Sequence, residues 1–386
     1  MVSTEELLTI MMRKHASDLH FGVGRPPFLR IDGDLMPMDS DVLDDEDLER
    51  VAKHLLTPKR EYRLEEENEI DFSYAFINQD GDRGRFRVNV FRQKATVAVA
   101  IRHVPDTVPG FDILNLPLIL EELSLERRGI ILITGTTGSG KSTTLAAMID
   151  YVNNRRPVHI LTIEDPIEYV LYDKEAIINQ RELGVDTNSF LDAIRGAMRE
   201  DPDTIMVGEM RDRETVTATF QAALTGHLVL TTLHTLDVVQ TINRIIDFYP
   251  ETMQKQARIM LSETIKAIIS MRLLPMVGGG RLPAMEIMKS TGRIREFIED
   301  AEKTELIKLA MEEGEDEGMI TFDRYLLKLY KEGRITYETA IAAASSPHDF
   351  KLLEQKETDF SDKVMHRVEQ YQRTTSSGQE IYKGGL

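Results

Sequence analysis

Short apolar runs separated by helical segments dominate the middle of the chain. Four of these runs have the length and composition of buried strands, and they cover residues 130–133, 159–163, 204–207 and 228–232. Strands that are apolar on both faces and alternate with helices are typical of a largely parallel sheet covered on both sides. We therefore predict an α/β core, in which a nucleotide would bind at the carboxyl ends of the strands.

The N-terminal part of the chain, from residue 17 to about 105, is instead rich in short strands and contains an acidic helix near residues 45–56. Residues 85–90 alternate between polar and apolar side chains. The alternation places Phe86, Val88 and Val90 on one face and Arg85, Arg87 and Asn89 on the other. We predict a small α+β domain whose sheet exposes arginines on one face.

Prolines and glycines suggest where the parts of the chain meet. We predict an N-terminal domain over residues 1–105, a linker over 106–118, and a core with C-terminal helices over 119–355. The polar segment 356–386 is predicted to be mostly disordered.

The C-terminal third is predicted to be helical from about residue 253 to 353. Glycines are expected to stop these helices, at Gly278-Gly279-Gly280, Gly292 and Gly314. A short amphipathic helix is predicted between Phe360 and Tyr371, because the apolar residues there recur with helical spacing.

The charge balance limits the possible partners. A formal net charge of −18 opposes binding to nucleic acid and to anionic lipid, since both need a basic surface. We therefore expect no nucleic-acid partner, which argues against a DNA translocase. The chain has no cysteine, which excludes disulfides, thiol catalysis and cysteine–zinc sites.

Hydropathy gives an expectation about the membrane. No stretch approaches the ~18–20 consecutive apolar residues of a membrane helix. Residues 1–12 carry Glu5 and Glu6 and lack a basic leader, so they indicate an amphipathic helix and not a signal peptide. We expect a cytoplasmic protein that does not insert directly into a membrane.

The clearest chemical signal is a glycine-rich loop between an apolar run and a helical segment. Residues 135–142 read Gly-Thr-Thr-Gly-Ser-Gly-Lys-Ser, which is a complete phosphate-binding loop. Its backbone N–H groups and Lys141 would hold the phosphates of a nucleoside triphosphate, and the Ser142 hydroxyl would ligate Mg²⁺. The predicted nucleotide-binding residues are Gly135, Thr136, Thr137, Gly138, Ser139, Gly140, Lys141, Ser142 and Thr143.

Two carboxylates follow predicted strands, where hydrolysis of a phosphoanhydride would need a metal ligand and a group that activates water. Glu164 ends the run 159–163, and Glu209 follows the run 204–207. Each could instead cap a helix or form a salt bridge.

Two histidines, His227 and His234, flank one apolar run and are seven residues apart. An odd separation places their side chains on opposite faces of an extended segment. At most one would then face the phosphates unless a turn intervenes, and either could be an ordinary core histidine.

The order of the motifs adds a resemblance to a known family. The segments 135–142, 163–169, 208–212 and 226–235 together resemble the bacterial secretion-superfamily ATPases, in particular the type IV pilus retraction ATPases of the PilT and PilU type. The match extends to Ser-Asp-Leu-His at 17–20, Gly-Arg-Phe-Arg-Val-Asn at 84–89 and Gly-Met-Ile-Thr-Phe-Asp-Arg-Tyr-Leu at 318–326. It implies a RecA-like P-loop ATPase core, a PAS-like N-terminal domain and a hexameric ring that hydrolyses ATP to power pilus retraction and twitching motility.

The resemblance also implies roles for the candidate site residues. Glu164 would activate the attacking water, and Glu209 would help Ser142 to hold Mg²⁺. His227 and His234 would form the histidine box of the family.

The family uses arginines of the N-terminal domain on the nucleotide. Arg87 and Arg102 are the first candidates for this role, with Arg85 and Arg92 as reserves. An arginine on an exposed strand can equally have no catalytic role, and the sequence does not rank the four.

The resemblance further implies partners and a location. We expect a homo-hexamer, peripheral at the cytoplasmic side of the inner-membrane pilus base. Its partners would be the inner-membrane platform protein and a paralogous retraction ATPase.

The sequence leaves the exact role within the family open. Residues 293–298 read Arg-Ile-Arg-Glu-Phe-Ile and depart from the retraction-motor pattern, which favours a PilU-like accessory protein, whereas residues 199–203 look more like PilT. One alternative is therefore a weakly active paralogue that acts with another retraction ATPase. A pilus assembly or type II secretion ATPase is disfavoured, because those relatives usually carry a four-cysteine zinc insertion.

Overall fold

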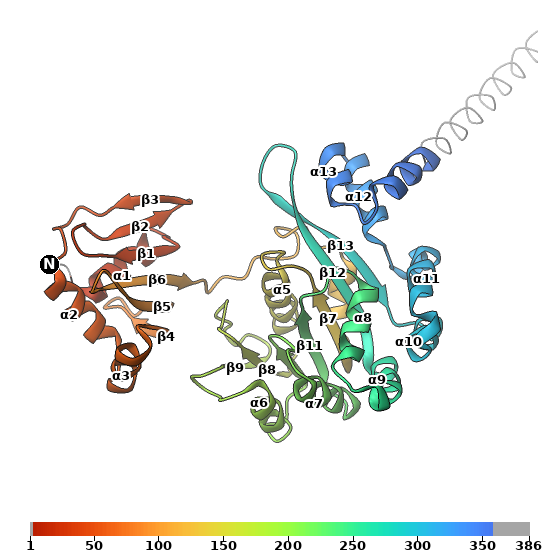
Figure 1. Cartoon of the computed structure of the whole chain (residues 1–386), viewed down its shortest axis with the longest axis horizontal. Coiled ribbons are helices and arrows are strands. Elements are labelled where there is room, and N and C mark those ends of the chain that lie inside the picture. The colour runs from red at the N-terminus through yellow and green to blue at the C-terminus, as the bar shows by residue number, and fades with distance from the viewer. Residues whose placement is uncertain (1–2, 358–386) are drawn as a thin grey trace, which may run out of the picture. The chain divides into compact units, whose positions relative to one another are not determined.

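The computed structural model describes residues 3–357 and contains two β-sheets (Figure 1). The first sheet is antiparallel and six-stranded, in the order β3-β2-β1-β6-β5-β4. Its strands are β1 (Asp18–Phe21), β2 (Phe28–Ile31), β3 (Asp34–Pro37), β4 (Glu69–Ile77), β5 (Arg83–Gln93) and β6 (Thr96–Val104). The helices that accompany it are α1 (Thr4–Arg13), α2 (Asp45–Leu55) and α3 (Pro58–Glu67).

Capping boxes begin the first two helices. The Ser3 side chain accepts the N–H of Glu6, whose carboxylate accepts the N–H of Ser3 in return, and Asp44 and Asp47 form the same pair at α2. These caps satisfy N–H groups that a helix start leaves without intrahelical partners. The helices predicted within 1–12 and 45–56 are confirmed, as α1 and α2, for the residues that the structure describes.

The core of this sheet lies on the face that packs against α1 and α2. Phe86, Val88 and Val90 of β5 are buried together with Leu8 of α1 and Leu48 of α2. Burial of each large apolar side chain stabilises the fold by about 1.5–3 kcal/mol. The opposite face carries the arginines, so the predicted alternation over 85–90 is confirmed.

The second sheet has seven strands in the order β13-β12-β7-β11-β10-β8-β9. They are β7 (Gly129–Thr134), β8 (His159–Glu164), β9 (Ile177–Glu182), β10 (Thr204–Val207), β11 (Leu228–Leu233), β12 (Ile265–Pro275) and β13 (Arg281–Lys289). The pairs β7/β12, β8/β9, β8/β10 and β10/β11 are parallel, and β12/β13 is antiparallel. The four predicted core strands are confirmed.

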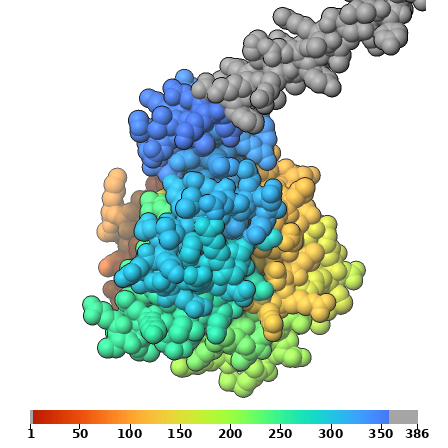
Figure 2. Space-filling view, turned by 90° about the vertical axis from the view of Figure 1, so that its right-hand side faces the viewer, coloured from red at the N-terminus to blue at the C-terminus, as the bar shows by residue number. Residues whose placement is uncertain are grey.

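Helices alternate with these strands and then continue beyond the last one. They are α4 (Ile119–Ser124), α5 (Lys141–Asn153), α6 (Phe190–Ala197), α7 (Arg213–Leu224), α8 (Val238–Asp247), α9 (Glu251–Thr264), α10 (Gly292–Glu299), α11 (Ile307–Glu313), α12 (Phe322–Lys331) and α13 (Tyr337–Ala343), with 3-10 turns at Ala301–Leu306 and Glu315–Glu317. Figure 2 shows the face over which the segments after β13 lie, in cyan to blue. No helix in residues 3–357 is long and apolar enough to span a membrane.

The prediction of a helical region from about 253 to 353 is wrong over β12 and β13. These strands form a hairpin, and β12 lies between β7 and β13 with most of its residues buried. A strand buried on both faces has no apolar–polar alternation, so its sequence cannot be told from that of a buried helix. Gly278, Gly279 and Gly280 make the hairpin turn with positive φ angles of 88°, 101° and 80°.

The other two predicted helix stops have different outcomes. Gly292 is the first residue of α10, whose N-terminus is capped by the Thr291 hydroxyl, so the expected stop is wrong there. Gly314 directly follows α11 and confirms the expectation.

The chain divides into two compact units that interleave along the sequence. The first unit comprises the described residues up to Gly110, Ser124–Arg128 and Ser142–Thr231. The second comprises Phe111–Leu123, Gly129–Lys141 and the described residues from Thr232 onward. The domain boundaries 1–105, 106–118 and 119–355 stay a prediction, and the helix predicted between Phe360 and Tyr371 lies outside the described residues.

Candidate nucleotide-binding and active site

In the second unit, the loop after β7 folds around its own lysine. The Lys141 ammonium donates to the carbonyl oxygens of Gly135 at 2.9 Å and Thr136 at 3.0 Å. It also lies 3.5 Å from Nδ1 of His234. Lys141 is only 8% exposed, so its charge is fixed in place by the loop and by the residue that follows β11.

The same loop has the shape and the donors of a phosphate site. Gly135 has a φ angle of 144°, and a Cβ there would collide with the Met271 carbonyl oxygen and the Ser139 side chain. Ser139 is buried, and its Oγ has no hydrogen-bond partner among the residues that the structure describes. A buried hydroxyl without a partner is costly, and a phosphate oxygen would satisfy it.

The remaining loop residues differ in their exposure to solvent. Thr136, Thr137 and Gly138 are exposed, and Gly140 is half-buried. In the first unit, Ser142 and Thr143 lie in the first turn of α5, where the unpaired N–H groups of a helix start favour an anion. The Thr143 hydroxyl lies 3.3 Å from that of Tyr169.

Glu164, the last residue of β8, is a buried acid of the first unit. It is 7% exposed, and its Oε1 accepts hydrogen bonds from the Thr162 hydroxyl at 2.7 Å and the Gln180 amide at 3.0 Å. Its Oε2 accepts the N–H of Glu168 at 3.4 Å. Burial raises the pKa of Glu164 above its ordinary value of 4.5, although the hydrogen bonds act in the opposite direction. A carboxylate whose pKa is raised and whose position is fixed by hydrogen bonds is suited to act as a general base.

Glu209 is placed beside Glu164 by the parallel pairing of β8 and β10, in which Ile163 is the partner of Val207. The Arg211 guanidinium connects the two strand ends. It donates from Nε to Glu209 at 2.8 Å and from Nη1 to Asp165 at 3.2 Å. The two acids thus follow adjacent strands, as the sequence predicts.

The two histidines lie at opposite ends of β11. His234 follows its carboxyl end and contacts Lys141, whereas His227 precedes its amino end. The His227 Nδ1 lies 2.9 Å from the Ala222 carbonyl oxygen at the end of α7. Seven residues of extended chain span about 23 Å, so only one of the two histidines can reach a phosphate held by Lys141.

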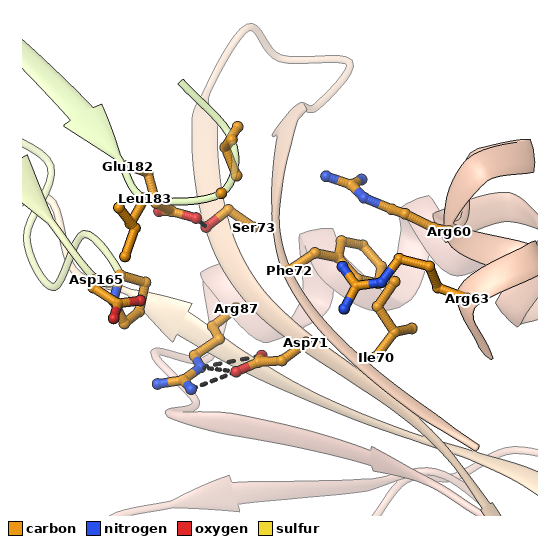
Figure 3. Close-up of a pocket in the computed structure, with 13 residues that line it drawn as sticks. Arg60, Arg63, Ile70, Asp71, Phe72, Ser73, Arg87, Asp165, Glu182 and Leu183 are labelled. Carbon is orange, nitrogen blue, oxygen red and sulfur yellow. Dashed lines mark hydrogen bonds and ion pairs between the residues drawn. The ribbon is translucent and has the colours of Figure 1, made fainter. Parts of the chain in front are cut away.

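The two first candidates, Arg87 and Arg102, share one face of the first sheet. Arg87 and Arg102 are cross-strand neighbours on β5 and β6. Arg87 makes a bidentate ion pair with Asp71, drawn in Figure 3, and Arg102 donates to the buried Asp18 at 2.8 Å. Both therefore have carboxylate partners within the N-terminal sheet.

The reserve arginines differ from each other. Arg85 donates from Nη2 to Glu182 of β9 at 2.8 Å, and Arg92 is exposed near the end of β5. Glu182 lines a pocket of the first unit together with Ser73, Arg87 and Asp165 (Figure 3).

Sequence reasoning missed two polar residues of β9, Gln180 and Glu182. They share a strand face with the buried Ile178, and Glu182 is itself 3% exposed. Polar side chains at the inward positions of a strand are a signal of function, but the strand has to be recognised first. A run of Ile-Ile-Asn-Gln-Arg-Glu lacks the apolar content that marks the other core strands.

Two features define the class of protein. A glycine-rich loop surrounds a lysine after one strand of a mainly parallel sheet, and a buried acid ends another strand of that sheet. Together they are the features of a P-loop nucleotide hydrolase of the RecA-like kind. The chain belongs to the family of type II/IV secretion system proteins, whose model matches residues 5–280. It is an ATPase of this family, as the resemblance in its motifs implies.

Relatives of known name match nearly the whole chain. The type IV pilus retraction ATPase PilT of Pseudomonas aeruginosa is 42% identical over 345 residues, which are 89% of this chain and 99% of the relative. The type IV pilus ATPase PilU of the same organism is 39% identical over 350 residues, which are 90% of each chain. A crystal structure of the pilus retraction motor PilT with bound ADP superimposes with a TM-score of 0.82 at 45% identity, over 90% of this chain and 99% of that one. The predicted fold class and the membership of the PilT/PilU family are confirmed.

Proposed function

We propose that this protein is a homo-hexameric motor that hydrolyses ATP to power retraction of a type IV pilus, and with it twitching motility. The observation that carries the proposal is the match to PilT, which covers 99% of that relative and includes the phosphate-binding loop. Lys141, held by the phosphate-binding loop, and the buried Glu164 support it. Hydrolysis needs a cation on the phosphates and a group that activates water, and these two residues provide them.

The proposed reaction is attack of a water molecule on the γ-phosphorus of ATP. The water oxygen forms the new bond to phosphorus as the bond to the β–γ bridging oxygen breaks, and the products are ADP and inorganic phosphate. Glu164 orients this water and takes its proton, and Lys141 neutralises charge on the phosphates.

The residues also fit a magnesium ion. Among the described residues, no cluster of three or more acidic or histidine side chains forms a dedicated metal site. Mg²⁺ is usually held by one or two carboxylates together with substrate phosphates, and Ser142 and Glu209 offer the hard oxygen donors that it prefers. We therefore assign the metal to these two residues, where it would neutralise phosphate charge during the reaction.

We retain Arg87 and Arg102 as the arginines that act on the nucleotide, with Arg85 and Arg92 as reserves. A guanidinium that meets the transferred phosphoryl group can raise kcat by about 10³–10⁵. Arg87 and Arg102 are each held by an aspartate in this structure, so either must exchange that carboxylate for a phosphate to act.

The proposal includes partners and a place. The ring would work in the cytoplasm, peripheral to the inner membrane at the pilus base, and act on the platform protein there. A second candidate is an accessory paralogue that works with another retraction ATPase, and the similarity to PilU over 90% of the chain favours it.

The test is Mg²⁺-dependent ATP hydrolysis by the purified full-length chain over a range of protein concentrations. A motor gives turnover per subunit that rises cooperatively as the ring assembles. Deletion of the gene in its native host should then abolish pilus retraction. Nucleotide binding without turnover at any concentration would instead favour the accessory role, and normal retraction in the deletion strain would exclude both.

The histidines provide a second prediction. His234→Ala is expected to lower kcat/KM for ATP at least about tenfold more than His227→Ala, because only His234 contacts the phosphate-loop lysine. Steady-state hydrolysis by both variants, at a concentration where the wild type is fully assembled, measures the difference. Equal losses would place both histidines in one catalytic unit, such as a site shared between subunits.

A further inference from the structure

We propose that Glu182 is a positioning residue, which ties the segment that follows Glu164 to the N-terminal sheet so that ATP turnover depends on this contact. The inference rests on the proposed function, since it takes Glu164 as the residue that activates water. All of the groups involved lie in the first unit.

The Glu182 carboxylate joins three segments that are distant in sequence. It accepts hydrogen bonds from the Ser73 hydroxyl of β4 and from Nη2 of Arg85 of β5, the latter at 2.8 Å. Its Oε2 also accepts the backbone N–H of Ile167 at 3.2 Å. Figure 3 shows the carboxylate facing Ser73 at one end of the pocket.

The backbone of β9 places this carboxylate next to Glu164. The two glutamates are register partners in the parallel pair β8/β9, and the N–H of Leu183 donates to the Glu164 carbonyl oxygen at 2.8 Å. Ile167 comes three residues after Glu164. Glu182 therefore fixes the segment that follows the proposed base. The backbone hydrogen bond from Leu183 fixes Glu164, the proposed base.

A second residue on the same strand face completes the arrangement. The Gln180 amide nitrogen donates to Glu164 at 3.0 Å and to the Tyr169 carbonyl oxygen at 2.9 Å, and its oxygen accepts the N–H of Leu171. Gln180 thus orients the Glu164 side chain, and Glu182 connects the same segment to the N-terminal sheet. Movement of that sheet would be felt by the proposed base through β9.

The energetics favour a contact that is either fully made or broken. The Glu182 side chain is 4% exposed and Arg85 is 24% exposed, so withdrawal of the arginine would leave a buried carboxylate without its cation. Removing one partner of a buried ion pair is strongly destabilising. A partly separated pair also leaves both charges unsatisfied, so we expect Glu182 and Arg85 to be either in contact or fully apart.

The pocket that these groups line does not have the properties of a ligand site. Its volume is about 160 Å³, below the roughly 300–1,000 Å³ typical of small-molecule sites. Two of its acids, Asp71 and Glu182, already have arginine partners. The polar groups are therefore arranged for contact between the two parts of the unit.

Steady-state ATP hydrolysis and thermal unfolding of full-length variants test the proposal. Glu182→Gln and Arg85→Gln are each expected to lower kcat about 10- to 100-fold, the scale of a misplacement of about 1 Å at the site. The KM for ATP should stay within about twofold, because Glu182 positions the proposed base and makes no phosphate contact. The double variant should lose no more than the worse single variant, since both changes break one connection.

Two controls and one milder variant separate positioning from general damage. Glu67→Gln makes the same chemical change in the exposed ion pair between Glu67 and Arg63 on α3, and it should leave kcat unchanged. Asp323→Asn alters a buried carboxylate in the second unit that accepts the Ser345 N–H, and it should lower the unfolding temperature without lowering kcat. Ser73→Ala removes only the hydroxyl and should reduce kcat about threefold in a folded protein, which keeps the test open if the charge variants misfold.

The outcomes are distinct. Loss of thermal stability in Glu182→Gln with kcat within about twofold of wild type would overturn the proposal, as would a raised KM with unchanged kcat. Wild-type protein that hydrolyses no ATP would instead reject the proposed function itself.

Discussion

Replacement of Glu164 by glutamine is expected to lower kcat for ATP hydrolysis by about 10²- to 10⁴-fold, the range that a positioned general base contributes. The amide has nearly the same shape but cannot accept a proton from water at neutral pH. Lys141 and the phosphate-binding loop are untouched, so the affinity for ATP should stay within about threefold of wild type. Single-turnover hydrolysis and equilibrium titration with ATP measure the two quantities separately.

The same substitution should raise the thermal stability of the protein. Glutamine can keep its oxygen where Oε1 accepts from Thr162 and Gln180, and it gives up only the 3.4 Å bond from the N–H of Glu168. It also removes a charge that burial disfavours. Each 1 kcal/mol gained raises the unfolding midpoint by about 2–4 °C in a domain of ~150–250 residues.

The pH dependence follows from the raised pKa of Glu164. Between the ordinary value of 4.5 and the higher native pKa, the folded protein binds more protons at this site than the unfolded chain does. The contribution of Glu164 to stability therefore falls as pH rises through this window, and the glutamine variant should lack that slope. The acid limb of kcat/KM should lie above 4.5 for wild type, because the base must be ionised to act.

Glu168→Gln is the matched control for this prediction. It makes the same change four residues later on an exposed residue, whose backbone N–H donates to Glu164 and whose charge makes the smallest contribution to the raised pKa of Glu164. Its activity and stability should equal those of wild type. A fully active Glu164→Gln protein would remove Glu164 from the reaction, and a lower unfolding midpoint would contradict the cost assigned to its burial.

The sequence predicts this part of the site well because parallel strands align their carboxyl ends. A residue that directly follows one apolar run must then lie near its counterpart after the neighbouring run. Glu164 and Glu209 satisfy this rule through the pairing of Ile163 with Val207. The phosphate-binding loop is equally local, since its glycines, lysine and following helix are contiguous in the chain.

Three strands of the second sheet were not predicted from the sequence, and the reasons are opposite. The β12/β13 hairpin is mostly buried and lacks a regular alternation of polar and apolar residues, so helix was expected there. Strand β9 is at the edge of the sheet and too polar to resemble a buried strand. Gln180 and Glu182 were lost with it, because a side chain can be assigned to a site only after its strand is placed.

Partners of charged side chains are the least predictable feature. Arg85 and Arg87 occupy one sheet face as the alternation predicts, and Arg102 is the cross-strand neighbour of Arg87. Each of the three has an acid partner from a different element: Glu182, Asp71 and Asp18. These partnerships depend on which strands become neighbours, and no local pattern encodes that. The separation of His227 and His234 is more predictable, because the apolar run between them already indicates an extended strand.

Replacement of Lys141 by alanine should weaken ATP binding strongly, whereas Glu164→Gln lowers only turnover. The ammonium is fixed by the carbonyl oxygens of Gly135 and Thr136, so it is already in place when a phosphate arrives. Hydrogen bonds to charged groups contribute about 1.5–3 kcal/mol each, and a loss of about 3 kcal/mol corresponds to a fall of roughly 100-fold in affinity for ATP. Hydrolysis should fall to background at ATP concentrations that saturate the wild type.

Lys174→Ala is the matched control, since Lys174 is a half-exposed lysine that pairs with Asp150 of α5. It should bind and hydrolyse ATP as the wild type does. Titration of both variants and of Glu164→Gln with a fluorescent ATP analogue, beside a phosphate-release assay, separates the two functions of the site. Wild-type affinity in Lys141→Ala would contradict the assignment of the caged lysine to the phosphates. Weak binding in Glu164→Gln would show that the carboxylate supports the nucleotide as well as the water, because Lys141 alone would then not account for affinity.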